Sequence, residues 1–69
     1  MSDHVYKKIE LTGSSTESAD QAVRNALAKA AKTIKHMDWF EVTETRGEIR
    51  NGQVAHWQVS LKLGFRLEE

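Results

Sequence analysis

Apolar and polar residues alternate at the start of the chain, over residues 4–12 (HVYKKIELT). One face of this segment carries most of its apolar side chains, namely Val5, Ile9 and Leu11. A period of two predicts a half-buried strand. The alternation then stops, because Gly13 permits a turn and Ser14 with Glu17 has the spacing of a capping box, which predicts a helix start.

The next segment has the period of a helix. Its apolar positions follow the i, i+3, i+4, i+7 pattern, namely Ala19, Ala22, Val23, Ala26, Leu27, Ala30, Ala31 and Ile34. The stripe is mostly alanine, so it is flat and allows a sheet to approach closely. We expect one helix of about 21 residues, roughly 30 Å long.

Two long strands follow, over residues 38–50 and 53–67. Asn51-Gly52 between them is typical of a type I′ hairpin, whose two central residues both need a positive φ. The predicted core face of the last strand carries Trp57, Val59, Leu61, Leu63, Phe65 and Leu67. The chain is therefore predicted to be a single α+β domain over residues 1–69, in the order β-α-β-β, with its sheet packed on one long helix.

The turn sets the register of the hairpin and so the side on which Trp39 lies. It pairs Phe40 with Leu63 and Val42 with Leu61 on the core face, and Glu41 with Lys62 on the outer face. Trp39 then lies opposite Gly64 on the outer face, where glycine is expected to leave open space beside the indole. That space suits a flat ligand or a neighbouring subunit.

The same register gives pairs nearer the turn: Thr43 with Ser60, Thr45 with Gln58, Gly47 with His56 and Ile49 with Val54. Gly47 is also a candidate for a β-bulge, which would re-aim Arg46. Without a bulge, Arg46 lies opposite Trp57. Both arrangements remain open from the sequence.

Element lengths indicate self-association. A strand of about 13 residues spans roughly 43 Å, more than the helix covers. The far end of the hairpin carries Ile49, Val54 and Trp57, and soluble monomers rarely expose such an arm. Trp39 and Gln58 lie about 20 Å apart along one face, so they can contact one small ligand only across an interface between copies.

Composition removes several classes of protein. Ten basic and ten acidic residues cancel, which argues against a nucleic-acid partner. The chain has no cysteine, and its three histidines (His4, His36 and His56) lack zinc-site spacing, so no metal site is expected. No apolar run approaches the roughly 20 residues of a membrane span, and the N-terminus has no signal-peptide core, so we expect a cytoplasmic protein without a membrane partner.

Three sequence blocks resemble the dodecin family: YKKIELTGSS, then DWFEV followed by Arg46-Gly47, and QVSLKLGFRLEE. The resemblance covers nearly the whole chain. It implies a three-stranded antiparallel sheet curved around one helix, twelve copies forming a hollow homododecamer, and no enzymatic turnover. It also implies a role in storing flavin and limiting its photochemistry.

The resemblance assigns roles to particular residues. Trp39 matches the tryptophan that stacks on flavins held in pairs between neighbouring subunits. Gln58 matches the glutamine that hydrogen-bonds the polar edge of the ring, and Arg46 matches an arginine near the flavin or its phosphate. The implied cofactor is FMN, with riboflavin and FAD as alternatives. Some members also bind coenzyme A on the assembly surface. Arg66 is not assigned by the resemblance, but it is a further candidate cofactor-binding residue, for a phosphate-bearing ligand on the surface.

Each of these residues also has a structural interpretation. Trp39 alone fits a protein-interface anchor, and Gln58 alone fits a solvated polar residue. Arg46 can stack on Trp57 or pair with Glu44, and Arg66 can pair with the terminal acids. The alternative function is therefore a structural, oligomeric interaction module that binds no flavin. A flavin-dependent enzyme is disfavoured, because no nucleophile-base pair is visible.

Overall fold

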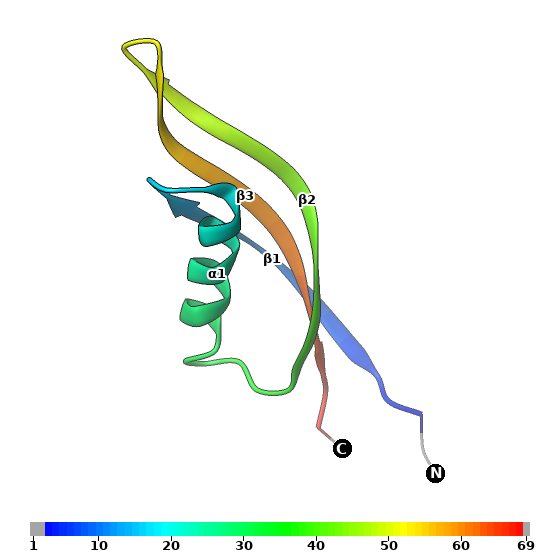
Figure 1. The fold of residues 1–69 in the computed structure, drawn as a ribbon. Helices are drawn as coiled ribbons and strands as arrows, with labels where there is room; N and C mark the ends of the chain where they lie inside the picture. The colour runs from blue at the N-terminus through cyan, green and yellow to red at the C-terminus, as the bar shows by residue number, and fades with distance from the viewer. Residues whose placement is uncertain (1–2, 69) are drawn as a thin grey trace.

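The computed structural model describes residues 3–68 and has the predicted element order (Figure 1). Strand β1 (Tyr6–Ser15) is followed by helix α1 (Ala19–Ala30) and by strands β2 (Met37–Arg50) and β3 (Gln53–Arg66). The antiparallel sheet has the order β1-β3-β2, so β3 is its central strand. The predicted α+β class and three-stranded sheet are confirmed. The predicted domain over residues 1–69 also includes positions 1, 2 and 69, which lie outside the described residues.

The start of the helix differs from the prediction. Strand β1 continues to Ser15, because its last residues keep pairing with β3 as far as Ser15 opposite Trp57. The helix cap is Ser18 rather than Ser14: the backbone N–H of Gln21 donates to Ser18 Oγ at 3.0 Å. Ser14 therefore does not cap the helix, because it is paired within the sheet. Ser18, the first serine after β1, is the N-cap instead.

The helix is also shorter than predicted, with 12 residues instead of about 21. It ends in a tightened turn, in which Lys32 N–H donates to Lys29 O at 3.2 Å and Thr33 N–H to Ala30 O at 3.1 Å. His36 then has a positive φ of 63° and leads the chain into β2. The apolar pattern continued to Ile34, but apolar periodicity does not report where backbone hydrogen bonding changes.

The core lies between α1 and the central strand. Three alanines of the helix (Ala22, Ala26 and Ala30) and three residues of β3 (Val59, Leu61 and Leu63) are buried. The helix packs on β1 and β3, so the side of β2 that faces the same way is left largely uncovered. Phe40 and Val42 point to that side, as predicted, yet 46% and 47% of their surfaces remain exposed.

The hairpin of β2 and β3 projects well beyond the helix (Figure 1). The chain measures 56 × 21 × 13 Å along its principal axes, which is elongated for its size. Asn51 and Gly52 have φ values of 54° and 75°, which confirms the predicted turn. Ile49 and Val54 near the tip are 75% and 52% exposed, so a single copy does have the apolar arm that the sequence indicated.

The predicted register is right at both ends of the hairpin and wrong in its middle. Trp39–Gly64, Phe40–Leu63, Glu41–Lys62, Val42–Leu61 and Ile49–Val54 are paired as predicted. From Glu44 to Glu48 every partner is displaced by one residue, between irregularities at Val42/Glu44 and Glu48/Ile49. The predicted pairs of Thr43, Thr45 and Gly47 are therefore wrong. Thr43 is the extra residue, and its hydroxyl donates to Glu10 Oε2 at 3.0 Å.

No helix of the described residues is long and apolar enough to cross a membrane. Within residues 3–68, no group of three or more histidine, aspartate or glutamate side chains is placed to hold a metal ion.

Candidate functional site

Trp39 lies on the outer face of the sheet, on the side away from the helix, as predicted. It is opposite Gly64 of β3 and is 39% exposed. The space over Gly64 is not open, contrary to the prediction, because the indole itself fills it. A Cβ at Gly64 would overlap Cε2 and Cζ2 of the indole and would lie 2.6 Å from Cδ2. Trp39 therefore rests on the backbone of β3 and still presents indole surface to a flat ring.

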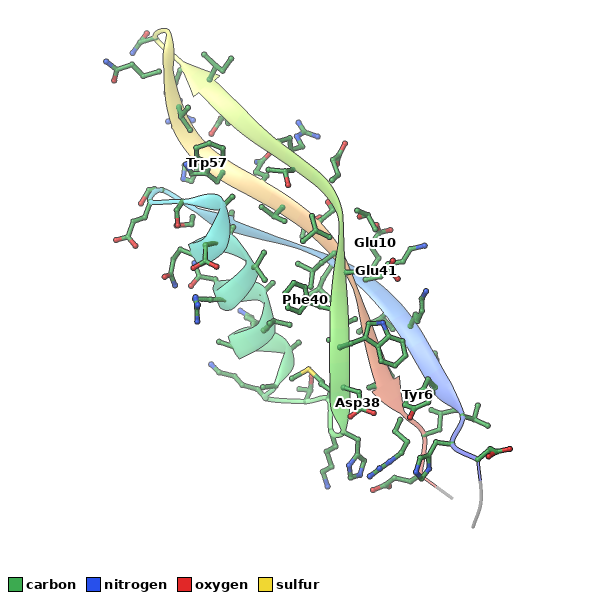
Figure 2. The ribbon with its side chains drawn as sticks, turned by 45° about the vertical axis from the view of Figure 1, so that its right-hand side comes forward. Tyr6, Glu10, Asp38, Phe40, Glu41 and Trp57 are labelled. Carbon is green, nitrogen blue, oxygen red and sulfur yellow. The ribbon has the colours of Figure 1, made fainter. Side chains whose placement is uncertain are left out.

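Tyr6 contacts the same indole from the opposite edge of the sheet, across β3. Its ring centroid is 5.1 Å from that of Trp39, with the two planes at 63°. The labelled Tyr6 side chain is at the lower end of the outer face in Figure 2. This contact was not identified from the sequence. The strand order β1-β3-β2 was the missing information, because it places the first strand beside the last one.

Arg66 belongs to the same end of the sheet, where it pairs with Tyr6 across β1 and β3. Its guanidinium donates to His36 Nδ1 at 3.4 Å, while His36 Nε2 donates to Glu68 at 3.1 Å. The sequence suggested pairing of Arg66 with the terminal acids, but Glu68 binds His36 instead and residue 69 lies outside the described residues. We call Tyr6, Trp39 and Arg66 the aromatic end of the outer face.

A pocket of about 400 Å³ lies beside Arg66, between the helix–strand connection and the end of the chain. Its lining combines cationic and apolar side chains: Thr33, Ile34, Lys35, His36, Phe65, Arg66, Leu67 and Glu68. Such a lining can accept an anion attached to an apolar group.

Arg46 and Gln58 lie opposite each other on the outer face, nearer the hairpin tip. The bulge brings them together, since without it Arg46 would lie on the inner face. Gly47 takes the place opposite Trp57, so the suggested stacking of Arg46 on Trp57 is wrong. Within residues 3–68, Arg46 forms no ion pair with Glu44 or another acid. We call Arg46 and Gln58 the polar end of the outer face.

The two ends are far apart within one chain. Gly64 beneath the indole and Gln58 are six residues apart on β3, a separation of about 20 Å at 3.3 Å per residue. The structure therefore keeps Trp39 and Gln58 as far apart as predicted. Within one copy, a small ligand can contact either Trp39 or Gln58. A ligand that contacts both side chains must therefore lie between two copies.

An ion cluster lies next to the polar end, on the hairpin tip. His56 Nδ1 donates to Glu48 Oε1 and Arg50 Nη2 donates to Glu48 Oε2, both at 2.9 Å. The hydrogen bond from His56, followed by the hydrogen bond and charge of Arg50, holds the pKa of the Glu48 carboxyl below its ordinary value.

This lowered pKa has a consequence for stability. The stabilisation is complete above the ordinary glutamate pKa and is lost as the pH falls through the lower folded-state pKa of Glu48. We expect Glu48→Gln to lower the thermal midpoint slightly at neutral pH and to flatten its decline in acid, as measured by calorimetry across pH. Glu44→Gln is the control, because Glu44 forms no ion pair within the described residues. Identical acid profiles for Glu48→Gln and the unsubstituted protein would contradict this prediction.

The position of the Trp39 indole should depend on the absence of a side chain at Gly64. In Gly64→Ala the new methyl group needs the volume that the indole occupies, so the ring must turn away from β3. We expect the near-ultraviolet circular dichroism of the tryptophan to change and ligand stacking to weaken about tenfold, the loss of roughly one aromatic contact. Gly47→Ala is the control for an added methyl group, because Gly47 has no positive φ and its Cβ would approach the carbonyl oxygen of His56 only to 3.3 Å. An unchanged spectrum in Gly64→Ala would show that the indole does not rest there.

Comparison with known proteins gives concordant matches. The family model described as Dodecin matches residues 5–68. A curated Dodecin from Thermus thermophilus is 55% identical over 65 residues, which cover 94% of each chain. The structure of dodecin from Streptomyces coelicolor superposes with a TM-score of 0.95 at 61% identity, over 100% of this chain and 99% of that one. Dodecin from Streptomyces davaonensis gives a TM-score of 0.95 at 50% identity, over 99% of this chain and 100% of that one.

Proposed function

The chain belongs to the dodecin family, and we propose that it stores and sequesters flavin by stacking the ring on Trp39. Members of this family bind flavins as homo-oligomers and are not enzymes, so this chain is a binding protein. We also propose that residues 1–69 form one domain.

The observation that carries the proposal is the position of the Trp39 indole over Gly64 on the outer face of the sheet. An indole that rests on Gly64 and is still 39% exposed provides a firm, flat, electron-rich surface. The isoalloxazine ring of a flavin is flat and electron-poor, which makes it a matching partner for offset stacking. The residues present therefore fit the group.

The distance between the two ends supports an arrangement between copies. If two chains meet with their outer faces together and their strands antiparallel, Trp39 of one copy approaches Gln58 of the other. The glutamine amide both donates and accepts, which matches the mixed polar edge of a flavin. We propose that flavins are held in pairs at such contacts, between the tryptophans of two subunits.

The preferred flavin is proposed to be FMN rather than riboflavin or FAD. The bulge places Arg46 on the outer face beside Gln58, and no acid within residues 3–68 neutralises it. A guanidinium with free donors suits a phosphate group through its fixed fork. Coenzyme A is proposed as a second ligand at the pocket beside Arg66, whose lining combines Lys35 and His36 with apolar groups.

The proposed assembly is a homododecamer in the cytoplasm. The inner side of β2 and the hairpin tip expose Phe40, Val42, Ile49 and Val54 in a single copy. Surfaces of this kind are usually covered in soluble proteins, and further copies of the chain are proposed to cover them.

A bound flavin would supply its absorption and redox chemistry, and the contacting indole of Trp39 would quench the excited state of the flavin.

The alternative is a structural interaction module in which Trp39 binds only protein. The exposed apolar side of β2 favours it, since this surface calls for a partner whether or not flavin is present.

Size-exclusion chromatography with added FMN and detection in the visible flavin band separates the two functions. Co-elution of flavin absorbance with a dodecamer-sized peak is the expected result. A dodecamer that elutes without flavin absorbance, and that leaves flavin fluorescence unquenched in solution, would overturn flavin storage and support the structural module. A parallel run with riboflavin tests the preference for the phosphate, and a run with coenzyme A, followed by the ultraviolet absorbance of its adenine, tests the second ligand.

A further inference from the structure

Trp39 gains its fixed position from both neighbouring strands. The central strand has no side chain at Gly64, so aromatic rings from β1 and β2 can meet over it. Tyr6 reaches from β1 and Trp39 from β2, and their rings touch edge to face at 5.1 Å and 63°. Such T-shaped contacts are favoured between aromatic rings because the positive edge of one meets the negative face of the other.

The other outer-face residues near the indole are engaged elsewhere. Lys8 lies directly opposite Gly64 in β1, but its ammonium group binds Glu41 of β2 at 3.0 Å. Arg66 approaches His36. Tyr6 is thus the aromatic neighbour that the structure gives to Trp39, and His4 in turn packs against Tyr6 with a centroid distance of 6.4 Å.

We propose that Tyr6 is a positioning residue for the flavin platform. Gly64 supports the indole from below, and Tyr6 holds its tilt from the side. A tryptophan that is 39% exposed would otherwise sample several rotamers, and each would have to be given up when a ring stacks on it. An indole that is already oriented binds a flat ring without that cost.

The inference rests on the proposed function for its ligand but not for its geometry. The orientation of the indole exists in the flavin-free protein and can be measured there. The proposal therefore has one readout without flavin and one with flavin, and the two can fail independently.

The test uses the full chain in a Trp57→Phe background, in which Trp39 is the remaining tryptophan of the two. Tyr6→Leu removes the ring, and Tyr6→Phe keeps it without the hydroxyl. Near-ultraviolet circular dichroism of the indole is measured without flavin, and flavin affinity is measured by fluorescence quenching. Size-exclusion chromatography confirms equal assembly.

We expect Tyr6→Leu to lose most of the indole dichroism and to bind flavin roughly three- to tenfold more weakly, the usual worth of one aromatic contact. Tyr6→Phe should keep both properties. Unchanged dichroism and affinity in Tyr6→Leu would overturn the proposal, and so would an equal loss in both variants, since that would assign the effect to the hydroxyl.

If Tyr6→Leu does not assemble, the proposal can still be tested on the protein that retains Tyr6. With isotope-labelled tryptophan, nuclear Overhauser contacts between the Tyr6 and Trp39 rings are expected in the flavin-free protein. Their absence would overturn the proposal. If the dichroism changes as expected while no variant or parent binds flavin, the positioning role stands and the proposed function fails.

Discussion

Trp39→Ala is expected to weaken flavin binding by about a hundredfold or more while the oligomer persists. Loss of the indole removes about 1 kcal/mol of stacking and about 2 kcal/mol of apolar burial, and each 1.4 kcal/mol corresponds to tenfold in affinity. The fold should survive because the side chain lies outside the core formed by α1 and β3. Fluorescence titration with FMN measures the affinity, and size-exclusion chromatography measures the assembly.

The second tryptophan offers a matched control. Trp57 lies on the inner side of β3, opposite Gly47, where it is half-buried. Trp57→Phe should leave flavin affinity within about threefold of its normal value, since its ring is on the far side of the sheet from the platform. Equal losses in the Trp39 and Trp57 variants would indicate a general structural effect. Disassembly of Trp39→Ala, together with a parent protein that binds no flavin, would favour the interaction module.

Gly13→Ala is expected to produce the largest loss of stability. An added Cβ would overlap the backbone carbonyl oxygen of Ala22 and lie 2.9 Å from Ala26 Cβ. Relief requires the helix to move off β1, since neither obstacle is the end of a flexible side chain. Overpacking of this kind costs about 1–3 kcal/mol or more, which is a large part of the roughly 5–15 kcal/mol that holds a typical domain. Urea unfolding at one fixed protein concentration measures the change.

Gly47→Ala is the control for this prediction. Its added methyl group would lie 3.3 Å from the carbonyl oxygen of His56, so a small adjustment accommodates it. We expect its urea midpoint to stay close to that of the unsubstituted protein. A Gly13→Ala midpoint equal to that of Gly47→Ala would show that the helix and β1 are less closely packed than the structure indicates.

Gly13 also shows where sequence reasoning stops. The sequence pattern predicts that the first strand ends at this glycine, yet β1 passes through it to Ser15. What the position requires is the close approach of an alanine-rich helix face. A local pattern contains the alanines and the glycine, but it does not say that they are opposite each other across the helix–sheet contact.

The site was predictable to a different degree at its two ends. The turn predicted the outward orientation of Trp39 correctly, because the register shifts at Glu48/Ile49 and Val42/Glu44 cancel and restore the pairing that Asn51-Gly52 sets. The place of Arg46 did not follow, since it depends on a bulge that Thr43 stabilises through Glu10 of another strand. The contact with Tyr6 depends in the same way on which strand lies beside β3.

The sequence by itself determined the element order, the hairpin turn, the core face of β3 and the outward side of Trp39. Each of these depends on residues close together in the chain, through periodicity or through the φ preference of a turn. The tertiary structure alone decided the ends of the helix, the bulges, the side on which Arg46 lies and the meeting of Tyr6 with Trp39 over Gly64. Those features depend on hydrogen bonds and contacts between strands that are far apart in sequence, which no local pattern encodes.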